Sequence, residues 1–320
     1  MAENAHIPVG VGGNLGTPVL ELLNPAIDLY ILELSSFQLE TTHSLKAAAA
    51  IVLNVSEDHM DRYVNMLDYH QAKHRVYRNC QFYVTNRQDP LTVPLLPDSV
   101  PHTSFGLDTP DLTSYGVIRE AGQVYLAKGR EKLMLASEMG IFGEHNIANA
   151  LAALALGEAV NLPMSVMLQT LKDFKGLAHR CQLVTKHHQV AWYNDSKGTN
   201  VGATLAAIHG LGAAITGKVI LIAGGVGKGQ DFTPLSPVLA RYAKAVIFIG
   251  EDAPKIDAVI TAPIEKVYAS SLIDAVNRAQ ALASAGDAVL LSPACASFDM
   301  FKHYEDRGQQ FVSAVMTVTG

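Results

Sequence analysis

The sequence predicts an α/β protein whose sheets are mostly parallel, with a small antiparallel addition. Short apolar runs of strand length recur along the chain, and longer segments of helical periodicity lie between several of them. This alternation is typical of β-α units, in which a helix connects two parallel strands. Several apolar runs end in loops of glycine, hydroxyl and charged residues, and ligands bind at such strand ends in open α/β sheets.

The predicted elements follow from these patterns in chain order. Six apolar runs are predicted strands, at 29–32, 49–53, 82–85, 219–223, 245–249 and 288–291. Three segments are predicted helices, at 67–79, 146–160 and 272–285. The stretch 112–139 alternates around three glycines, so we expect a small antiparallel hairpin insertion there. The pattern restarts after Gly176, which predicts a first domain at 1–176 and a second at 177–320.

Composition limits the class of protein. The chain has 320 residues, which is enough for two domains, and a net charge of −6, which gives no reason to expect nucleic acid or a membrane surface as partner. Its longest apolar stretches, such as 147–156, are too short to span a bilayer, and the first four residues lack the basic flank of a signal peptide. The three cysteines lie far apart and indicate reduced thiols. We therefore expect a cytoplasmic protein, and we expect a monomer.

In the first half, two predicted strands end in polar segments. The strand 29–32 runs into ELSSFQLE at 33–40, and the strand 49–53 runs into NVSEDHMDR at 54–62. A carboxylate such as Glu33 at the end of a buried strand meets a cation, reaches water or caps a helix. If the two strands are neighbours, Glu33 and His59 converge on one metal, and oxygen with imidazole suits Mg²⁺ or Mn²⁺. The alternative for His59 is a capping or packing histidine.

Three further features of the first half are ambiguous by themselves. Periodicity alone makes Lys73 a solvated lysine on its helix. Asn146 and Asn149 share one face of the first turn of a helix opened by GEHNIAN, where amides either cap the helix or bind the edge of a heterocycle. The segment GVGGNLG at 10–16 precedes a predicted helix, but it lacks the spacing of a dinucleotide-binding loop.

The second half contains three polar loops after apolar strands. NDSKGTN at 194–200 follows a short strand at 190–192, GGVGKG at 224–229 follows the strand 219–223, and SPACASFDMF at 292–301 follows the strand 288–291. Glycines let the backbone approach a ligand, and Lys228 supplies a charge for a carboxylate or phosphate. The glycine-rich loop is not a phosphate loop, because Gly229 follows the lysine and Ile222 occupies the place of the first glycine.

Together these motifs resemble the Mur ligase family, from about Gly10 to the C-terminus. The residues at 195–197 favour the branch of the family that adds D-glutamate. The resemblance implies a central ATP-binding domain followed by a Rossmann-like C-terminal domain. It also implies an ATP-driven amide ligase that joins D-glutamate to UDP-N-acetylmuramoyl-L-alanine through an acyl phosphate, in peptidoglycan precursor synthesis.

The resemblance further implies a role for each matching residue. The metal, Mg²⁺, is expected to be held by Glu33, His59 and Lys73, the lysine as its N-carbamate. The UDP-muramoyl substrate is expected to contact Asn14, Ser35 and His59. ATP is expected to contact Asn146, Asn149, Arg180, Asp195 and Lys197. D-Glutamate is expected to contact Thr199, Lys228, Ser297 and Phe298. The residues expected to act in catalysis are Lys73, His59 and Lys228.

The chain also departs from the family. Members of the family begin with a UDP-binding domain, then a strand and a GxxGK[ST] phosphate loop, and these 320 residues contain none of them. We therefore expect uncovered apolar surface, an exposed sheet edge, low stability and weak or no catalysis by this polypeptide alone. Two alternatives remain open at this point. One is a folylpolyglutamate-type ligase, and the other is a non-catalytic remnant that binds nucleotide or D-glutamate.

Overall fold

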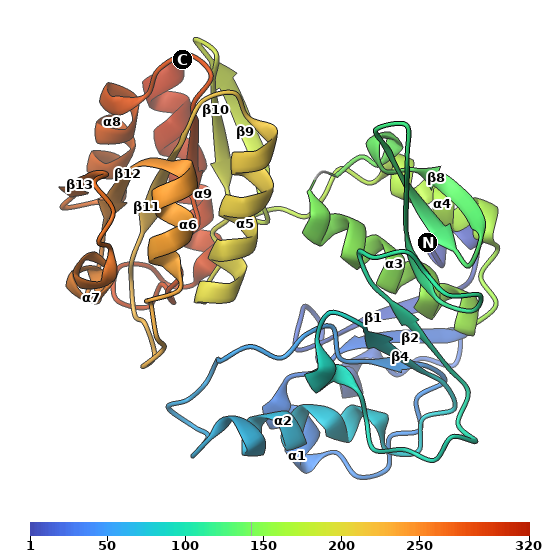
Figure 1. Cartoon of the computed structure of the whole chain (residues 1–320). Helices are drawn as coiled ribbons and strands as arrows, with labels where there is room; N and C mark the ends of the chain where they lie inside the picture. The colour runs from blue at the N-terminus through green and yellow to red at the C-terminus, as the bar shows by residue number, and fades with distance from the viewer. Residues whose placement is uncertain (142) are drawn as a thin grey trace. The chain divides into compact units, whose positions relative to one another are not determined.

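The computed structural model of the chain contains two compact units (Figure 1). It describes residues 1–141 and 143–320. The first unit comprises Met1–Val55 and Tyr63–Lys175, and the second comprises Ser56–Arg62 and Gly176–Gly320. Within the described residues, no helix has both the length and the hydropathy needed to cross a bilayer.

Two sheets form the first unit. The smaller one pairs β1 (Val9–Gly13) with β2 (Leu29–Glu33) in parallel. The larger one has the order β3-β4-β5-β6-β7-β8, parallel from β3 to β6 and antiparallel from β6 to β8. Its strands are β3 (Ala50–Ile51), β4 (Tyr83–Asn86), β5 (His102–Phe105), β6 (Tyr115–Glu120), β7 (Gln123–Lys128) and β8 (Glu131–Leu135). Among the residues that the structure describes, β2 and β3 each pair on one side only, and Ile31 of β2 is 47% exposed.

The helices of the first unit are α1 (Ser36–Thr41), α2 (Met66–His74), α3 (Glu144–Ala159) and α4 (Met164–Asp173). Local sequence sets their starts. Ser35 and Gln38 form a capping box at α1, and the Asn65 side chain caps α2. Leu151 and Leu154 of α3 are fully buried against the larger sheet, where they pack with Phe105 and Leu126.

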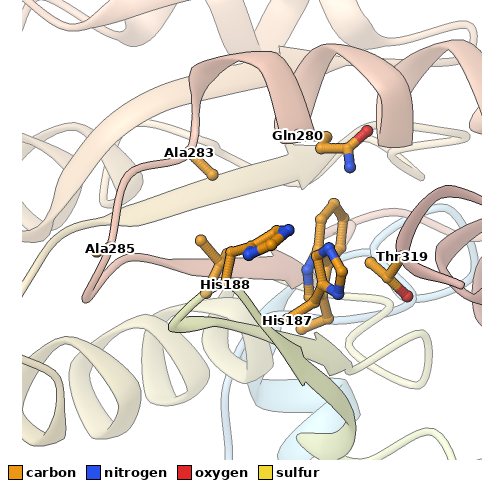
Figure 2. Close-up of a pocket in the computed structure, with 8 residues that line it drawn as sticks. His187, His188, Gln280, Ala283, Ala285 and Thr319 are labelled. Atoms are coloured by element: carbon orange, nitrogen blue, oxygen red, sulfur yellow. The ribbon is translucent and has the colours of Figure 1, made fainter.

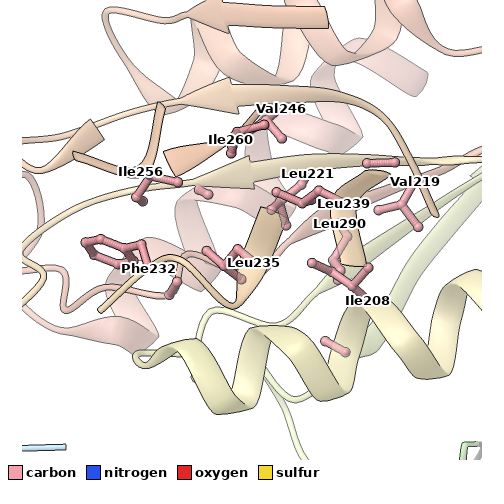
Figure 3. Close-up of a cluster of buried hydrophobic side chains, with 14 of the residues drawn as sticks. Ile208, Val219, Leu221, Phe232, Leu235, Leu239, Val246, Ile256, Ile260 and Leu290 are labelled. Carbon is pink, nitrogen blue, oxygen red and sulfur yellow. The ribbon is translucent and has the colours of Figure 1, made fainter. Parts of the chain in front are cut away.

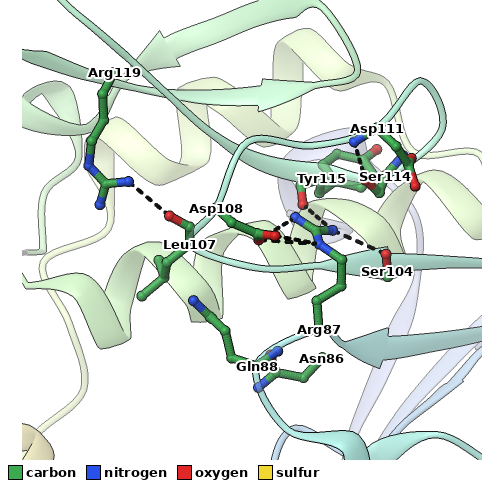
Figure 4. A network of polar contacts seen from close by, with 10 residues as sticks. All are labelled: Asn86, Arg87, Gln88, Ser104, Leu107, Asp108, Asp111, Ser114, Tyr115 and Arg119. Atoms are coloured by element: carbon green, nitrogen blue, oxygen red, sulfur yellow. Dashed lines mark hydrogen bonds and ion pairs between the residues drawn. The ribbon is translucent and has the colours of Figure 1, made fainter.

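Arg87 organises the loops of the larger sheet (Figure 4). Its guanidinium donates to Asp108 Oδ1 at 2.7 Å, to Ser104 Oγ at 3.1 Å and to the Tyr115 carbonyl at 3.0 Å. The hydrogen bond from Arg87 lowers the pKa of the Asp108 carboxyl. One arginine therefore connects the ends of β4 and β5 to the start of β6.

A single six-stranded sheet forms the centre of the second unit, in the order β13-β12-β11-β14-β10-β9. All neighbours are parallel except β9 and β10. Its strands are β9 (Gln182–His187), β10 (Val190–Asn194), β11 (Val219–Ala223), β12 (Ala243–Phe248), β13 (Glu265–Tyr268) and β14 (Ala288–Leu291). Its helices are α5 (Val201–Ala214), α6 (Leu235–Tyr242), α7 (Ala253–Val259), α8 (Leu272–Leu282) and α9 (Tyr304–Thr319).

Helices cover both faces of this sheet (Figure 1). On one face, Leu221 and Leu290 pack with residues of α5, α6 and α7 (Figure 3). On the other face, Ile220 and Ile222 pack with residues of α8 and α9. Every residue of β11 and β14 is buried, which explains why both strands are continuous apolar runs in the sequence. The predicted α/β fold is confirmed.

Three predicted elements differ from the structure. The strand predicted at 49–53 is only Ala50–Ile51, and the helix predicted at 67–79 ends at His74 and continues as a 3₁₀ turn. The antiparallel hairpin predicted at 112–139 is present as β6 to β8, and β6 also pairs with β5, so these strands extend the larger sheet. The helix predicted after 10–16 was wrong, since that region forms β1 and then a 3₁₀ turn, Val19–Leu22. Prolines at 18 and 25 leave room for about one turn there.

Candidate active site

Three loops of the second unit lie at one edge of its sheet. They are 195–200, 224–229 and 292–301, and they leave the carboxyl ends of β10, β11 and β14. These strands are neighbours in the order β11-β14-β10, so the loops are neighbours too. Backbone hydrogen bonds join them, with Val226 and Ala296 exchanging a pair at 3.0 and 2.9 Å and Ala294 N donating to Gly198 O at 2.9 Å. This edge is where an open α/β sheet binds its ligand.

Asp195 is buried at the start of the first loop and is 7% exposed. Its carboxylate accepts hydrogen bonds from Ser292 Oγ at 2.6 Å and from the Cys181 backbone N–H at 3.0 Å. Burial raises the pKa of Asp195 to about 6, although these hydrogen bonds favour the ionised form. In this structure the Asp195 carboxylate therefore connects the first loop to Ser292 and to the backbone of Cys181.

Lys197 and Tyr304 lie together beside this loop. The Lys197 Nζ atom is 4.1 Å from the centroid of the Tyr304 ring, an arrangement that cation–π attraction stabilises. Arg180 is exposed, and its charge favours the ionised form of Asp195. Tyr304 was not among the predicted site residues. The only signal in the sequence is its place shortly after the third loop.

Lys228 has a left-handed backbone conformation, with φ of 52°. Its Nζ atom lies 3.6 Å from Asp58 Oδ1, and Asn200 Nδ2 lies 3.4 Å from Asp58 Oδ2. Asp58 belongs to the segment Ser56–Arg62, which groups with the second unit, and so does His59. The ammonium group of Lys228 thus already faces a carboxylate, which is the chemical group that an acidic amino acid would present to it.

Ser297 and Phe298 differ in exposure although they are adjacent in the third loop. Ser297 is 2% exposed, and its carbonyl accepts from the N–H groups of Met300 and Phe301. Phe298 is 72% exposed, so its ring is available to a ligand. Thr199, in the first loop, is half-buried.

A buried arginine that sequence analysis missed connects two of the loops. Arg307 of α9 is 1% exposed and donates to Ser196 Oγ at 3.0 Å, to the Ser196 carbonyl at 2.8 Å and to the Cys295 carbonyl at 3.1 Å. Burial lowers its pKa to about 10. No pattern in the sequence distinguishes it from a solvated arginine on a helix.

In the first unit, Asn14 and Glu33 lie side by side at the ends of β1 and β2. Asn14 Nδ2 donates to Glu33 Oε1 at 3.2 Å, and the Asn14 N–H donates to the Glu33 carbonyl at 2.6 Å. Ser35 caps α1, accepting from the Gln38 N–H at 3.2 Å. Ser35 rather than Glu33 therefore caps α1, and the Glu33 carboxylate is exposed, as the alternative in which it reaches water predicts.

The remaining predicted residues of the first unit lie on helices. Lys73 is on α2, with its Nζ atom 4.8 Å from the centroid of the Tyr69 ring. Asn146 is half-buried and Asn149 is exposed in the first turns of α3. Burial lowers the pKa of their neighbour His145.

The predicted metal ligands fall in both units. Glu33 and Lys73 belong to the first unit and His59 to the second. Within residues 1–141 and 143–320, no group of three or more His, Cys, Asp or Glu side chains is arranged to hold a metal. The exposed Glu33 carboxylate is a hard oxygen donor of the kind that Mg²⁺ prefers. The predicted ligand set stays a prediction.

Comparison with known families accounts for both units. The model described as the Mur ligase middle domain matches residues 15–157, and the model described as the Mur ligase glutamate ligase domain matches residues 179–295. The UDP-N-acetylmuramoylalanine–D-glutamate ligase of Acinetobacter baylyi is 59% identical over 319 residues, which cover 98% of this chain and 71% of that protein. The chain belongs to the Mur ligase family. The enzyme of the same name from Pseudomonas aeruginosa is 56% identical over 98% of this chain and 70% of its own length.

Solved structures of Mur ligases share the fold. MurF from Acinetobacter baumannii superposes with a TM-score of 0.73 at 16% identity, over 99% of this chain and 72% of that one. MurF from Thermotoga maritima, in complex with ADP, superposes with a TM-score of 0.70 at 15% identity, over 99% and 76%. At such identities the likeness concerns the fold alone.

This Mur ligase also has a pocket of about 250 Å³ in the second unit (Figure 2). It lies at the amino ends of β10 and β14, between the turn at His187 and His188 and the C-terminal ends of α8 and α9. The two histidine rings are 3.9 Å apart between centroids. Because the three loops leave the carboxyl ends of these strands, this pocket is at the other edge of the sheet.

Proposed function

We propose that this Mur ligase joins D-glutamate to UDP-N-acetylmuramoyl-L-alanine at the expense of ATP. The observation that carries the proposal is the 59% identity, over 98% of the chain, to a relative named for this reaction. The three neighbouring loops of the second unit contain residue types that the proposal needs, namely a lysine that faces a carboxylate and two hydroxyl residues, Thr199 and Ser297.

The proposed reaction has two steps. The γ-phosphoryl group of ATP passes to the alanyl carboxylate, which gives an acyl phosphate and ADP. The amine of D-glutamate then attacks the acyl carbon, inorganic phosphate leaves, and the new amide nitrogen loses a proton. Phosphoryl transfer of this kind depends on positioning and on cationic groups rather than on covalent chemistry by the protein.

The D-glutamate site comprises one or two residues from each loop. In the proposal, the Lys228 ammonium pairs with a carboxylate of D-glutamate. This carboxylate replaces that of Asp58, which faces Lys228 in this structure. Thr199 and Ser297 offer hydroxyl groups, and the exposed Phe298 ring covers the carbon chain.

The remaining roles extend to the first unit. ATP is contacted by Asn146, Asn149, Arg180, Asp195 and Lys197, and the UDP-muramoyl substrate by Asn14, Ser35 and His59. Glu33, His59 and the N-carbamate of Lys73 would hold Mg²⁺, which would supply positive charge for phosphoryl transfer. Lys73 would repel the metal as an ammonium, but addition of CO₂ to its neutral amine, with loss of a proton, gives an anionic carbamate that would bind it. Lys73, His59 and Lys228 are the residues that act in catalysis.

The test is phosphate release by the protein purified from its native cell. We expect release only when ATP, UDP-N-acetylmuramoyl-L-alanine and D-glutamate are all present, and we expect Lys228→Met to abolish this D-glutamate-dependent release. Lys186→Met is the matched control, because Lys186 is an exposed lysine on β9.

Three outcomes would count against the proposal. Release that L-glutamate and a pteridine substrate support instead would favour the folylpolyglutamate-type alternative. Calorimetric binding of ADP and D-glutamate without turnover would favour the non-catalytic alternative. Equal activity of Lys228→Met and Lys186→Met would remove Lys228 from the site.

A further inference from the structure

The side-chain amide of Gln230 connects all three loops of the second unit. Its Oε1 atom accepts a hydrogen bond from the Val201 N–H at 2.9 Å. Its Nε2 group donates to the Gly227 carbonyl at 3.0 Å and to the Ala294 carbonyl at 2.7 Å. Val201 follows the first loop directly, Gly227 is in the second, and Ala294 is in the third.

These three partners match what a glutamine amide can offer. The amide has two N–H donors and one carbonyl acceptor, and here two carbonyls and one N–H face it. The reversed orientation would place N–H against N–H and carbonyl against carbonyl, so the hydrogen bonds determine which atom is which. Glutamate at this position would place a carboxylate oxygen against two carbonyls, and a shorter amide would lose contacts.

A glutamine that only stabilised its own turn would bond within that turn. Gln230 does so through its backbone N–H, which donates to the Gly227 carbonyl at 3.2 Å. Its side chain reaches further, to groups 29 and 64 positions away in the sequence. The long-range bonds are the ones that fix the loops relative to each other.

Lys228 depends on this arrangement through its neighbour Gly227. A φ of 52° is uncommon for lysine, so the residue keeps it only if the chain on each side is held. The Gly227 carbonyl is held by Gln230, and the Gly227 N–H donates to Asp252 Oδ2 at 2.7 Å. Both polar groups of the residue before Lys228 are therefore anchored by side chains.

We propose that Gln230 is a positioning residue that sets the three loops for D-glutamate, and this inference rests on the proposed function. D-Glutamate requires all three loops at once, because Thr199, Lys228 and Ser297 come from different ones. Of the residues assigned to ATP, two lie on these loops, Asp195 and Lys197, and both are on the first loop. Loss of the Gln230 amide thus weakens D-glutamate binding more than nucleotide binding.

The experiment compares Gln230→Met with wild type. Methionine keeps the length of the side chain and removes all three hydrogen bonds. The matched control is Gln280→Met on α8, where the exposed amide donates to the Val318 carbonyl at 3.1 Å, away from the loops. Calorimetry gives the dissociation constants for D-glutamate and for ADP, the KM for each substrate is measured where turnover allows, and thermal unfolding gives Tm.

We expect Gln230→Met to weaken D-glutamate binding roughly tenfold or more, since small misplacements of binding groups have effects of this size. We expect ADP binding to change less than about threefold by the same reasoning, because its groups stay in place. The control variant should match wild type in both constants. Unchanged D-glutamate binding in Gln230→Met overturns the proposal. An equal loss for both ligands together with a large fall in Tm assigns the residue to folding alone and also overturns it.

Backbone amide exchange separates this inference from the proposed function. If wild type does not bind D-glutamate, the proposed function fails, and exchange still decides the role of Gln230. Faster exchange in Gln230→Met at 199–201, 226–229 and 294–297 together supports the positioning role. Faster exchange confined to 226–230 overturns it.

Discussion

The buried carboxylate of Asp195 makes the stability of the second unit depend on pH. Its pKa is about 6 in the folded chain and close to the ordinary 3.8 in the unfolded one, and burial is the main cause of the difference. Between about pH 4 and pH 6, the folded chain keeps a proton that the unfolded chain has lost. This carboxyl therefore contributes a decrease in stability as pH rises through that window, and its contribution is constant above it.

The size of the effect follows from the shift. A rise from 3.8 to about 6 is about two pKa units, and each unit corresponds to about 1.4 kcal/mol, so the free energy of unfolding changes by about 3 kcal/mol. For a unit of this size, 1 kcal/mol corresponds to roughly 2–4 °C in Tm, which makes the expected change about 6–12 °C. Asp195→Asn removes the titration and keeps the shape of the side chain.

The assay is urea unfolding at several pH values between 4 and 7.5, with tryptophan fluorescence as the signal. The single tryptophan, Trp192, is 1% exposed in the second unit, so its signal reports that unit. We expect the stability of wild type minus that of Asp195→Asn to fall by about 3 kcal/mol from pH 4 to pH 7.5. A difference that stays flat across this range would refute the reasoning.

Asp274→Asn serves as a control of opposite sign. Hydrogen bonding to the Ser270 backbone and Arg278 lowers the pKa of Asp274. Its contribution to stability is present above its unfolded pKa and is lost as pH falls. Removing this carboxyl should therefore make the protein less sensitive to acid, whereas Asp195→Asn removes a contribution that favours the folded state at low pH.

Three further substitutions test the loops and the core. Gly224→Ala would place a Cβ 1.8 Å from the Ile249 carbonyl oxygen, so we expect a loss of at least about 2 kcal/mol by urea unfolding. Gly229→Ala is the control, because its Cβ meets nothing within 4 Å. If Gly229→Ala loses as much stability as Gly224→Ala, the clash with Ile249 does not explain the loss. Arg307→Met leaves the Cys295 and Ser196 carbonyls without their donor and should cost about 3 kcal/mol by the same assay, with Arg307→Lys between it and wild type. Wild-type stability in Arg307→Met would show that these bonds contribute nothing. Phe311→Ala opens a cavity beside Trp192 and should cost about 3–5 kcal/mol, and a measured loss below about 1 kcal/mol would mean that the site collapses without a void.

The fold was predictable where burial determines the sequence. β11 and β14 are buried on both faces, and the strands predicted from their apolar runs, 219–223 and 288–291, have the bounds that the structure shows. β5 was not predictable, because its sequence HTSF is mostly polar and it becomes a strand by pairing with β4 and β6. Tertiary pairing of this kind leaves no periodic signal in a single sequence.

The candidate site was predictable only in part for a similar reason. Loops at strand ends are visible in the sequence, and so are the motifs that resemble the family. The partners of individual side chains are not visible, because Arg307 and Ser196 are 111 positions apart and Gln230 and Ala294 are 64 apart. The orientation of the Asp195 carboxylate depends on Ser292, which is 97 positions away.

Polar side chains hold the three loops at the carboxyl ends of β10, β11 and β14, although Ala294 and Cys295 of the third loop also lie in the apolar core. Their residues are mostly small, and small residues bury little apolar surface that could fix a backbone. Asp252, Gln230 and Arg307 instead bond backbone groups of Gly227, Ala294 and Cys295. Hydrogen bonds are directional, so they set positions more narrowly than apolar contacts do. Substitutions at Gln230 should therefore change ligand affinity before they change the fold, whereas substitutions in the apolar core, such as Phe311→Ala, should do the reverse.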